Sequence, residues 1–200
     1  QKHFGDGKNL GMNFEYLIQP EPKGIAQAFI LGEKFIGSDM SCLVLGDNIF
    51  YGNLDFFYKA LQIEKGATIF GYQVNDPERY GIVEFDQSGK VISIEEKPAK
   101  PKSHYAVPGL YVFDNRVIEI SKNLKPSKRG ELEISDVNQA YLDLGELQVE
   151  KIGRGVAWLD TGTFDALMQA SLFVHAIEDR QGLMVAWVGG MAFRMGHLTL

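Results

Sequence analysis

Two short apolar runs in this sequence each end in an aspartate. Residues 43–45 are followed by Gly46 and Asp47, and a later run, GVAWLD, ends at Asp160. A run of this length fits a buried strand, and open α/β sheets bind their ligands beyond the carboxyl ends of such strands. A carboxylate there can hold a divalent cation against a phosphate, because Mg²⁺ takes one or two carboxylates together with phosphate oxygens. Asp47, with the Asn48 amide beside it, therefore predicts phosphate chemistry; the alternative is a plain Gly-Asp-Asn turn.

Other sequence signatures of chemistry are missing. The glycines of GDGKNLG, residues 5–11, have the wrong spacing for a dinucleotide-binding fingerprint, and no P-loop occurs. No serine lies in a nucleophile elbow. The four histidines are scattered without the spacing of metal ligands. The sequence gives little support to a hydride-transfer or a hydrolytic enzyme.

The first half of the chain alternates strand and helix patterns. We expect strands at 14–19, 43–45 and 67–74, and helices at 25–37 and from Asn53 to Leu61. Alternation of this kind is typical of a doubly wound parallel sheet. The loop at 20–24 contains two prolines, and Gly24 in it allows a ligand to approach the backbone closely.

The second half of the chain has a different pattern. A hairpin is expected over residues 81–98, and Pro108 and Gly109 interrupt the strand at 104–114, which predicts a bend beside a ligand. The other expected elements are a helix at 115–123, a helix capped by Ser135, strands at 147–152 and up to Asp160, and a helix capped by Thr163. No repeat and no long linker is visible, so we expect a single domain over residues 1–200.

The composition is that of an ordinary globular protein, since 45% of the 200 residues are hydrophobic and 23% are charged. A formal charge of −6 without a basic cluster argues against a nucleic-acid partner, whereas a mononucleotide needs only a few placed cations. Cys42 is the only cysteine, so we expect a small core residue and no disulfide within the chain, which fits a reducing cytoplasm. No apolar run approaches the ~20 residues of a membrane span, and no membrane partner is expected.

Six segments carry a family resemblance when they are taken in order. They are QPEPKGIAQA at 19–28, LGDN at 45–48, YG at 80–81, EEKP at 95–98, VPGLY at 107–111 and WLDTGT at 158–163, and SKRGELEISDVN at 127–138 joins them. Together they resemble the sugar-nucleotide pyrophosphorylases, most closely the glucose-1-phosphate thymidylyltransferase branch. The resemblance implies an α/β fold: a Rossmann-like nucleotidyltransferase domain with a mixed, mostly parallel sheet flanked by helices and a β-hairpin excursion for the sugar.

The resemblance also implies a reaction and its partners. Glucose 1-phosphate would attack the α-phosphate of dTTP directly, with Mg²⁺ as cofactor, giving dTDP-glucose and pyrophosphate. A uridylyl- or cytidylyltransferase on the same fold, and a sugar-nucleotide-binding protein without catalysis, are the alternatives. The family assembles as homotetramers, so we expect a homo-oligomer in the cytoplasm.

Residue roles follow from the same resemblance, position by position. It places Gln19 and Gly24 at the pyrimidine base, Asp47 and Asp160 at the metal, and Asp47 also at the nucleotide. Lys97 would reach the sugar phosphate as a point charge and would share the catalysis with the two aspartates. The glucose would be bound by Asn48, Gly81, Glu96, Lys97 and Val107, with Trp158 as a wall of the pocket. The alternatives are turn and capping acids for the aspartates, a solvated hairpin end for Glu96 and Lys97, and a core residue for Trp158.

The sequence departs from the family in two places. A strand and a glycine-rich loop with an arginine, followed by a lysine, cradle the triphosphate in the family, and nothing before Gln19 matches them. We therefore expect a chain that is truncated at both ends and inactive as it stands, because such cationic contacts are worth ~10³–10⁵ in rate. Gly189, Gly190 and Met191 replace an acidic pair near the family's regulatory nucleotide site, so the resemblance does not extend to feedback control.

Overall fold

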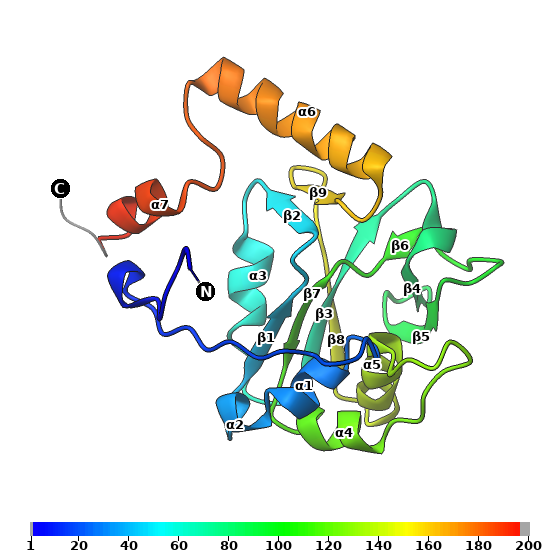
Figure 1. Cartoon of the computed structure of the whole chain (residues 1–200). Helices are drawn as coiled ribbons and strands as arrows, with labels where there is room; N and C mark the ends of the chain where they lie inside the picture. The colour runs from blue at the N-terminus through cyan, green and yellow to red at the C-terminus, as the bar shows by residue number, and fades with distance from the viewer. Residues whose placement is uncertain (1, 197–200) are drawn as a thin grey trace. The chain divides into compact units, whose positions relative to one another are not determined.

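A computed structural model describes residues 2–196, which fall into two compact units (Figure 1). Unit 1 consists of Gln1–Ile18 together with Asp160–Leu200, and unit 2 consists of Gln19–Leu159. The expectation of a single domain stays a prediction.

Unit 2 contains a seven-stranded sheet, a two-stranded sheet of β2 and β9, and five α-helices among its described residues. The strands are β1 (Ser41–Val44), β2 (Asn48–Tyr51), β3 (Ala67–Gln73), β4 (Gly81–Phe85), β5 (Val91–Glu96), β6 (Tyr105–Ala106), β7 (Leu110–Phe113), β8 (Leu147–Lys151) and β9 (Ala157–Asp160). The helices are α1 (Gln27–Leu31), α2 (Glu33–Ile36), α3 (Asp55–Ala60), α4 (Val117–Asn123) and α5 (Ile134–Asp143), with a 3-10 turn η2 at Pro77–Arg79. The last residue of β9 begins the second segment of unit 1, whose helices are η1 (Lys8–Leu10), α6 (Phe164–Gln181) and α7 (Val188–Arg194).

The large sheet is mixed but mostly antiparallel, so the prediction of a mostly parallel sheet is wrong. Its strand order is β1-β7-β3-β6-β4-β5, and β8 pairs with β3. Among its described strand pairs only β3 and β8 run parallel, and β7 runs antiparallel to both β1 and β3. β1 and β3 are therefore parallel to each other, as a strand–helix–strand unit requires, but β7 lies between them. The alternation of strands and helices indicated the direction of successive strands and could not show that a later strand fills the gap.

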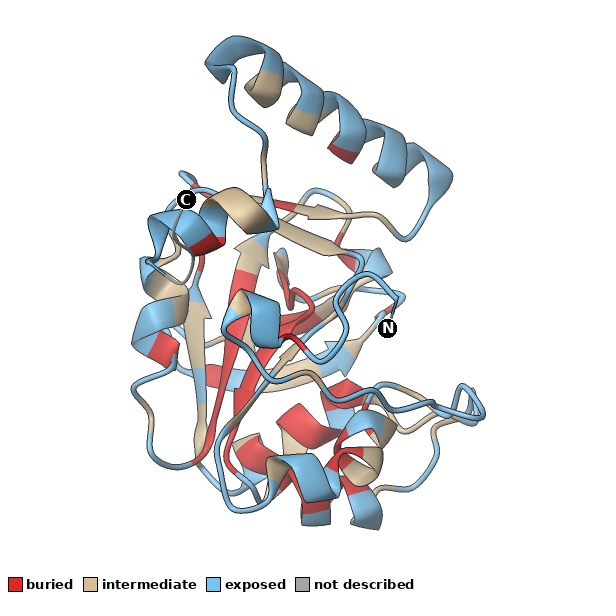
Figure 2. Cartoon of the chain, turned by 60° about the vertical axis from the view of Figure 1, so that its left-hand side comes forward, coloured by how far each residue is buried: buried red, intermediate tan, exposed pale blue. Residues whose placement is uncertain are grey.

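Helices pack on both faces of this sheet and form separate cores. On one face, Phe29 of α1, Val117 of α4 and Tyr141 of α5 share a buried cluster with Ile69 of β3. On the other face, the aromatic residues of α3 pack around Phe70, the next residue of β3. Successive side chains of a strand point to opposite faces, so β3 is buried on both sides and its apolar run is explained. Figure 2 shows this burial along the central strands.

Three local predictions in the first half of the chain are wrong. Residues 14–19 form no strand, and Leu17 and Ile18 are 61% and 87% exposed, because no described strand pairs with them. The helix expected at 25–37 is broken at Gly32 into α1 and α2, as the low helix propensity of glycine allows. Cys42 is exposed and is not a core residue, because in β1 it lies on the opposite face from Leu43, which packs against the cluster of α1, α4 and α5.

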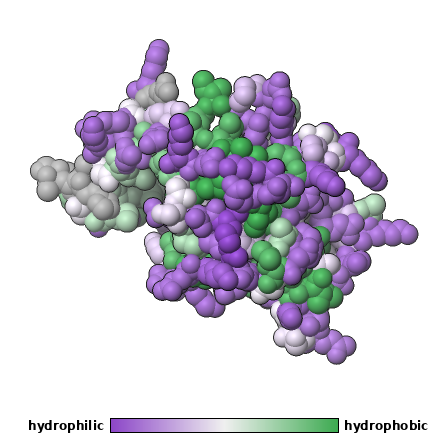
Figure 3. All heavy atoms as spheres, turned by 90° about the horizontal axis from the view of Figure 1, so that it is seen from below, coloured by the Kyte–Doolittle hydropathy of each residue, from purple (hydrophilic) through white to green (hydrophobic). Residues whose placement is uncertain are grey.

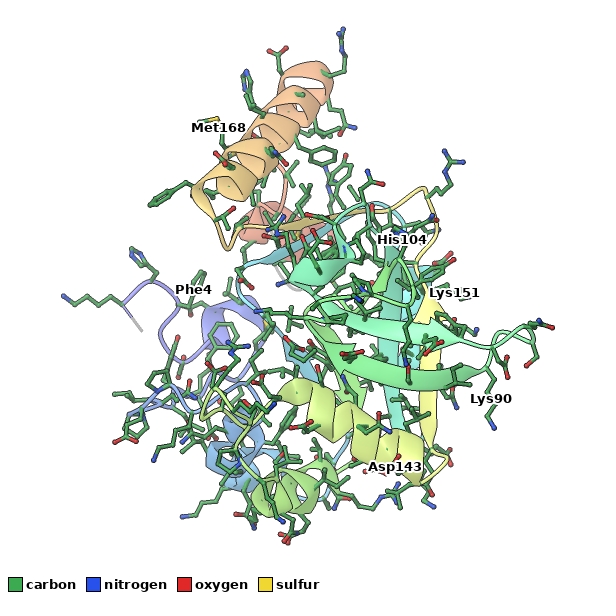
Figure 4. The ribbon with its side chains drawn as sticks, turned by 90° about the vertical axis from the view of Figure 1, so that its right-hand side faces the viewer. Phe4, Lys90, His104, Asp143, Lys151 and Met168 are labelled. Carbon is green, nitrogen blue, oxygen red and sulfur yellow. The ribbon has the colours of Figure 1, made fainter. Side chains whose placement is uncertain are left out.

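The second half of the chain follows its predicted pattern closely. The hairpin forms from β4 and β5, and Figure 4 shows it projecting with Lys90 near its turn. Pro108 and Gly109 separate β6 from β7, and Thr163 caps α6 by accepting a hydrogen bond from Ala166 N at 3.2 Å. Hydrophilic side chains dominate the face drawn in Figure 3, with hydrophobic ones in patches. No helix in the described part of the chain is long and apolar enough to cross a membrane.

Candidate functional site

Asp47 lies in an exposed turn that follows β1, as the sequence predicted. The pairing of β1 with β7 extends one residue beyond the strand, because Leu45 N donates to Gly109 O at 2.9 Å. The turn is closed by Asn48 N, which donates to Leu45 O at 3.1 Å, and β2 then begins at Asn48. β2 was not expected from the sequence. The backbone of Asp47 is thus held in a turn between two strands at the carboxyl end of β1.

The side-chain amide of Asn48 is the centre of a hydrogen-bond network at this turn. Its Oδ1 accepts from Trp158 Nε1 at 2.7 Å and from Gly109 N at 2.9 Å, and its Nδ2 donates to Asp47 Oδ1 at 2.8 Å. Gly109 is required here, since a Cβ would lie 2.8 Å from Asn48 Nδ2 and 2.7 Å from the Leu45 side chain. At the bend predicted at Pro108 and Gly109, the missing Cβ of Gly109 therefore allows the Asn48 side chain to approach the backbone.

Trp158 is 9% exposed and lies in an aromatic cluster of unit 2. Its ring centroid is 5.5 Å from that of Tyr72 and 5.1 Å from that of Tyr80. Packing fixes the indole, and the indole N–H in turn fixes the Asn48 amide. The role of Trp158 as a pocket wall stays a prediction.

The open end of the β4–β5 hairpin brings together the other predicted sugar-site residues. Gly81 and Glu96 are paired across the two strands, and a Cβ at Gly81 would lie 3.1 Å from Glu96 Oε2. Val107 N donates to Gly81 O at 2.8 Å, so the loop before β7 joins the same end. Lys97 follows with a φ of +43°, a left-handed backbone conformation that residues other than glycine rarely adopt. Strained residues of this kind cluster at binding sites.

The Glu96 carboxylate has a partner that the sequence did not reveal. Ser135 Oγ donates a hydrogen bond to Glu96 Oε2. Ser135 is not the N-cap of its helix, as was expected, because α5 begins at Ile134 with Glu133 at the N-cap position. The buried serine instead lies in the first helical turn, and its motif SKRGELEISDVN was the only sequence signal for it.

The carboxylates of Asp47 and Glu96 act on the same buried phenol. Burial raises the pKa of Tyr111 above its ordinary value, and the negative charges of Glu96 and Asp47 raise it further. Tyr111 belongs to β7, the strand between β1 and β3. The turn after β1 and the end of the hairpin are therefore parts of one electrostatic environment.

The predicted base-binding residues lie in the segment before α1. Gln19 Nε2 donates to Gly24 O at 3.2 Å and to Gln27 Oε1 at 2.6 Å, so the amide nitrogen faces the protein. Gly24 has a φ of +98°, and a Cβ there would lie 2.5 Å from Leu132 N and closer still to Leu132 O. Leu132 N also donates to Lys23 O at 2.7 Å. Gly24 is thus required by packing, whether or not a ligand approaches it.

Asp160 ends β9 and belongs to unit 1, whereas Asp47 belongs to unit 2. The Oδ1 of Asp160 accepts from Gly162 N at 3.3 Å. Within the described residues no three His, Cys, Asp or Glu side chains form a group that could hold a metal ion. A cation at either aspartate would need oxygens from a bound ligand or water, which is how Mg²⁺ is commonly held beside phosphates. The pairing of the two aspartates on one metal stays a prediction.

The chain is similar to known proteins over most of its length. A family model described as nucleotidyl transferase matches residues 1–177. A glucose-1-phosphate thymidylyltransferase from Xanthomonas campestris is 54% identical over 200 residues, which cover 99% of this chain and 68% of that protein. One of the same name from Mycobacterium tuberculosis is 55% identical, with 97% and 68% covered.

Two solved structures support the fold. A provisionally named glucose-1-phosphate thymidylyltransferase from Bacillus anthracis, in complex with sucrose, is 40% identical with a TM-score of 0.78, and the match covers 86% of this chain and 69% of that one. A UDP-glucose pyrophosphorylase in complex with UDP-glucose is 22% identical, with a TM-score of 0.70 over 82% of this chain and 66% of that one. The expected α/β nucleotidyltransferase fold is thereby confirmed, and the chain belongs to the nucleotidyl transferase family.

Proposed function

We propose that this protein transfers the thymidylyl group of dTTP to glucose 1-phosphate, giving dTDP-glucose and pyrophosphate. The observation that carries the proposal is the hairpin end, where Glu96, Gly81, Val107 and Lys97 lie together in a chain about 54% identical to enzymes of that name. A carboxylate beside backbone groups accepts from sugar hydroxyls, and an ammonium group next to it suits a phosphate. One end of the hairpin therefore offers both halves of a sugar phosphate a partner.

The amide of Gln19 supports a thymine or uracil base. Its nitrogen donates to Gly24 O and Gln27 Oε1, so Gln19 Oε1 is the atom of this amide that can accept from a ligand. Thymine and uracil carry a donor at N3 beside carbonyl acceptors, whereas cytosine presents an acceptor at N3 and an amino donor. Among the described hydrogen bonds none uses the Gly24 N–H, which could donate to a base carbonyl. This pattern fits the N3–H and a carbonyl oxygen that the bases of dTTP and UTP present.

The donor set also suits Mg²⁺. Carboxylate oxygens are hard ligands, and Asp47 is exposed at a strand end where a phosphate could complete the coordination. We propose that Asp47 holds the ion, which supplies positive charge beside the phosphates when it is bound.

The reaction requires charge compensation and alignment rather than a covalent intermediate on the protein. The sugar-phosphate oxygen attacks the α-phosphorus of dTTP, and the bond from that phosphorus to the pyrophosphate oxygen breaks. Glu96 would hold the glucose, and Lys97 would bring the attacking phosphate into line. Positioning of two reactants in this way can supply about 7–11 kcal/mol of the barrier.

The proposal is tested with the whole gene product, glucose 1-phosphate and dTTP, UTP or CTP in parallel. We expect pyrophosphate release with dTTP, less with UTP, and at least a 10²-fold lower kcat/KM with CTP. Binding of dTDP-glucose without any pyrophosphate release would contradict the transferase. Equal turnover of CTP would contradict the base assignment.

A homotetramer in the cytoplasm is likewise proposed, and light scattering checks its mass.

A further inference from the structure

We infer that Asn48 is a positioning residue for Asp47, and that Trp158 and Gly109 hold the Asn48 amide in the orientation this requires. The inference rests on the proposed function only in taking Asp47 as a cation ligand. Sequence reasoning assigned Asn48 to the sugar. The hydrogen bonds around its amide point to a second task.

The orientation of the Asn48 amide is determined by its neighbours. An indole N–H and a backbone N–H are donors only, so the atom that accepts from Trp158 Nε1 and Gly109 N must be the oxygen. The amide nitrogen is thereby directed to Asp47 Oδ1, 2.8 Å away. A flipped amide would place a donor against two donors and lose every one of these bonds.

Both groups that hold the amide are themselves fixed. Trp158 is buried and packs against the rings of Tyr72 and Tyr80. Gly109 follows a fully buried proline, and its lack of a Cβ is what lets Asn48 approach. These fixed core groups therefore orient the Asn48 amide, and the amide in turn orients the exposed carboxylate of Asp47.

A carboxylate fixed by an outer partner binds a cation better than one free to change rotamer. Groups that orient metal ligands typically contribute 10–100-fold in metal affinity. The second N–H of Asn48 Nδ2 is a donor that a sugar hydroxyl can use, so the two tasks are compatible. Asn48 would then connect the cation side of the site with the sugar side.

The chain offers a matched control. Asn53 Nδ2 donates to Asp55 Oδ2 at 2.8 Å, and Asn53 Oδ1 accepts from Asp55 N at 2.8 Å. This is a second Asn–Asp pair, exposed at the start of α3 and outside the proposed site. Asn53→Ala removes the same kind of contact without touching Asp47.

The experiment measures Mn²⁺ binding by electron paramagnetic resonance in the presence of dTTP, for wild type, Asn48→Ala and Asn53→Ala. We expect Asn48→Ala to weaken Mn²⁺ binding 10–100-fold and Asn53→Ala to leave it within 2-fold. Raising Mg²⁺ should restore much of the turnover of Asn48→Ala, which a misfolded variant would not show. Wild-type affinity in Asn48→Ala overturns the inference.

Asn48→Ala leaves two donors without an acceptor, so a second variant guards against loss of the fold. Trp158→Phe keeps an aromatic ring but removes the five-membered ring of the indole with its N–H, and it should weaken Mn²⁺ binding a few-fold. If each of these two variants that folds binds Mn²⁺ with wild-type affinity, the positioning role is contradicted. Crystal structures supply a readout that needs no cation: the Asp47 carboxylate should leave its wild-type position in Asn48→Ala, and an unmoved carboxylate overturns the inference. Failure of wild type to bind the Mn²⁺–dTTP complex would instead count against the proposed function.

Discussion

Gly24→Ala is the substitution whose consequences the structure specifies most fully. Two effects add. A non-glycine residue at a φ of +98° costs about 1–2 kcal/mol. The new Cβ would also meet the backbone of Leu132, which cannot move aside as a flexible side chain could.

Relief of that contact must separate the loop before α1 from the segment before α5. The separation would break the bonds from Leu132 N to Lys23 O, 2.7 Å, and from Ala26 N to Leu132 O, 3.2 Å. Each is worth roughly 0.5–1.5 kcal/mol. We therefore expect Gly24→Ala to lower the free energy of unfolding by about 2–5 kcal/mol.

Gly89→Ala is the matched control for this variant. Gly89 has a φ of +85°, and a Cβ there meets nothing within 4 Å. It carries the backbone penalty of about 1–2 kcal/mol without the packing conflict. Urea unfolding of both variants gives the difference directly, and calorimetry with dTDP-glucose should show weaker binding only for Gly24→Ala. Equal losses of stability would refute the packing argument, and unchanged ligand affinity would remove Gly24 from the base site.

Three further substitutions test other parts of the structure. Glu96→Gln should weaken glucose 1-phosphate binding roughly 10–100-fold in calorimetry, because the sugar loses a charged hydrogen-bond partner, and it should leave dTTP binding intact. Glu95→Gln, on the opposite face of β5, is the control and should change the binding of neither ligand. Asp47→Asn should lower turnover by about 10²–10³ at fixed Mg²⁺, and a near-normal rate would exclude it as a ligand. Burial disfavours the charged form of Asp114, but hydrogen bonds from Arg116 and Tyr141 outweigh this and lower its pKa. Its stabilisation is therefore present above the ordinary Asp pKa of about 3.9 and is lost as pH falls through the lowered value, so Asp114→Asn should flatten the acid limb of thermal stability.

Local pattern was enough to locate many of the site residues. The apolar run before Asp47 ends where a strand ends, and the turn residues of the hairpin bring β4 and β5 together. A register shift between Glu84 and Phe85 then places Gly81 opposite Glu96. These predictions depend on neighbours in the sequence.

Contacts between distant segments could not be predicted in the same way. Ser135 looked like a helix cap, because a serine at the start of a helical pattern usually is one. Its bond to Glu96 spans 39 positions in the sequence and depends on how α5 packs against the hairpin. The exposure of Cys42 likewise depends on which elements cover each face of β1, a property of the assembled sheet and not of the strand.

The position of β7 explains both the wrong prediction of a mostly parallel sheet and the assembly of the site. β7 pairs with β1 on one side and β3 on the other, and the residues just before β7 are Val107, Pro108 and Gly109. Because β7 runs antiparallel to β1, its beginning meets the end of β1, and Gly109 N reaches the Asn48 side chain beside Asp47. Val107, two residues earlier, reaches Gly81 at the hairpin. A directly paired, parallel β1 and β3 would remove this bridge, so the strand that contradicts the parallel pattern is the one that joins the Asp47 turn to the hairpin.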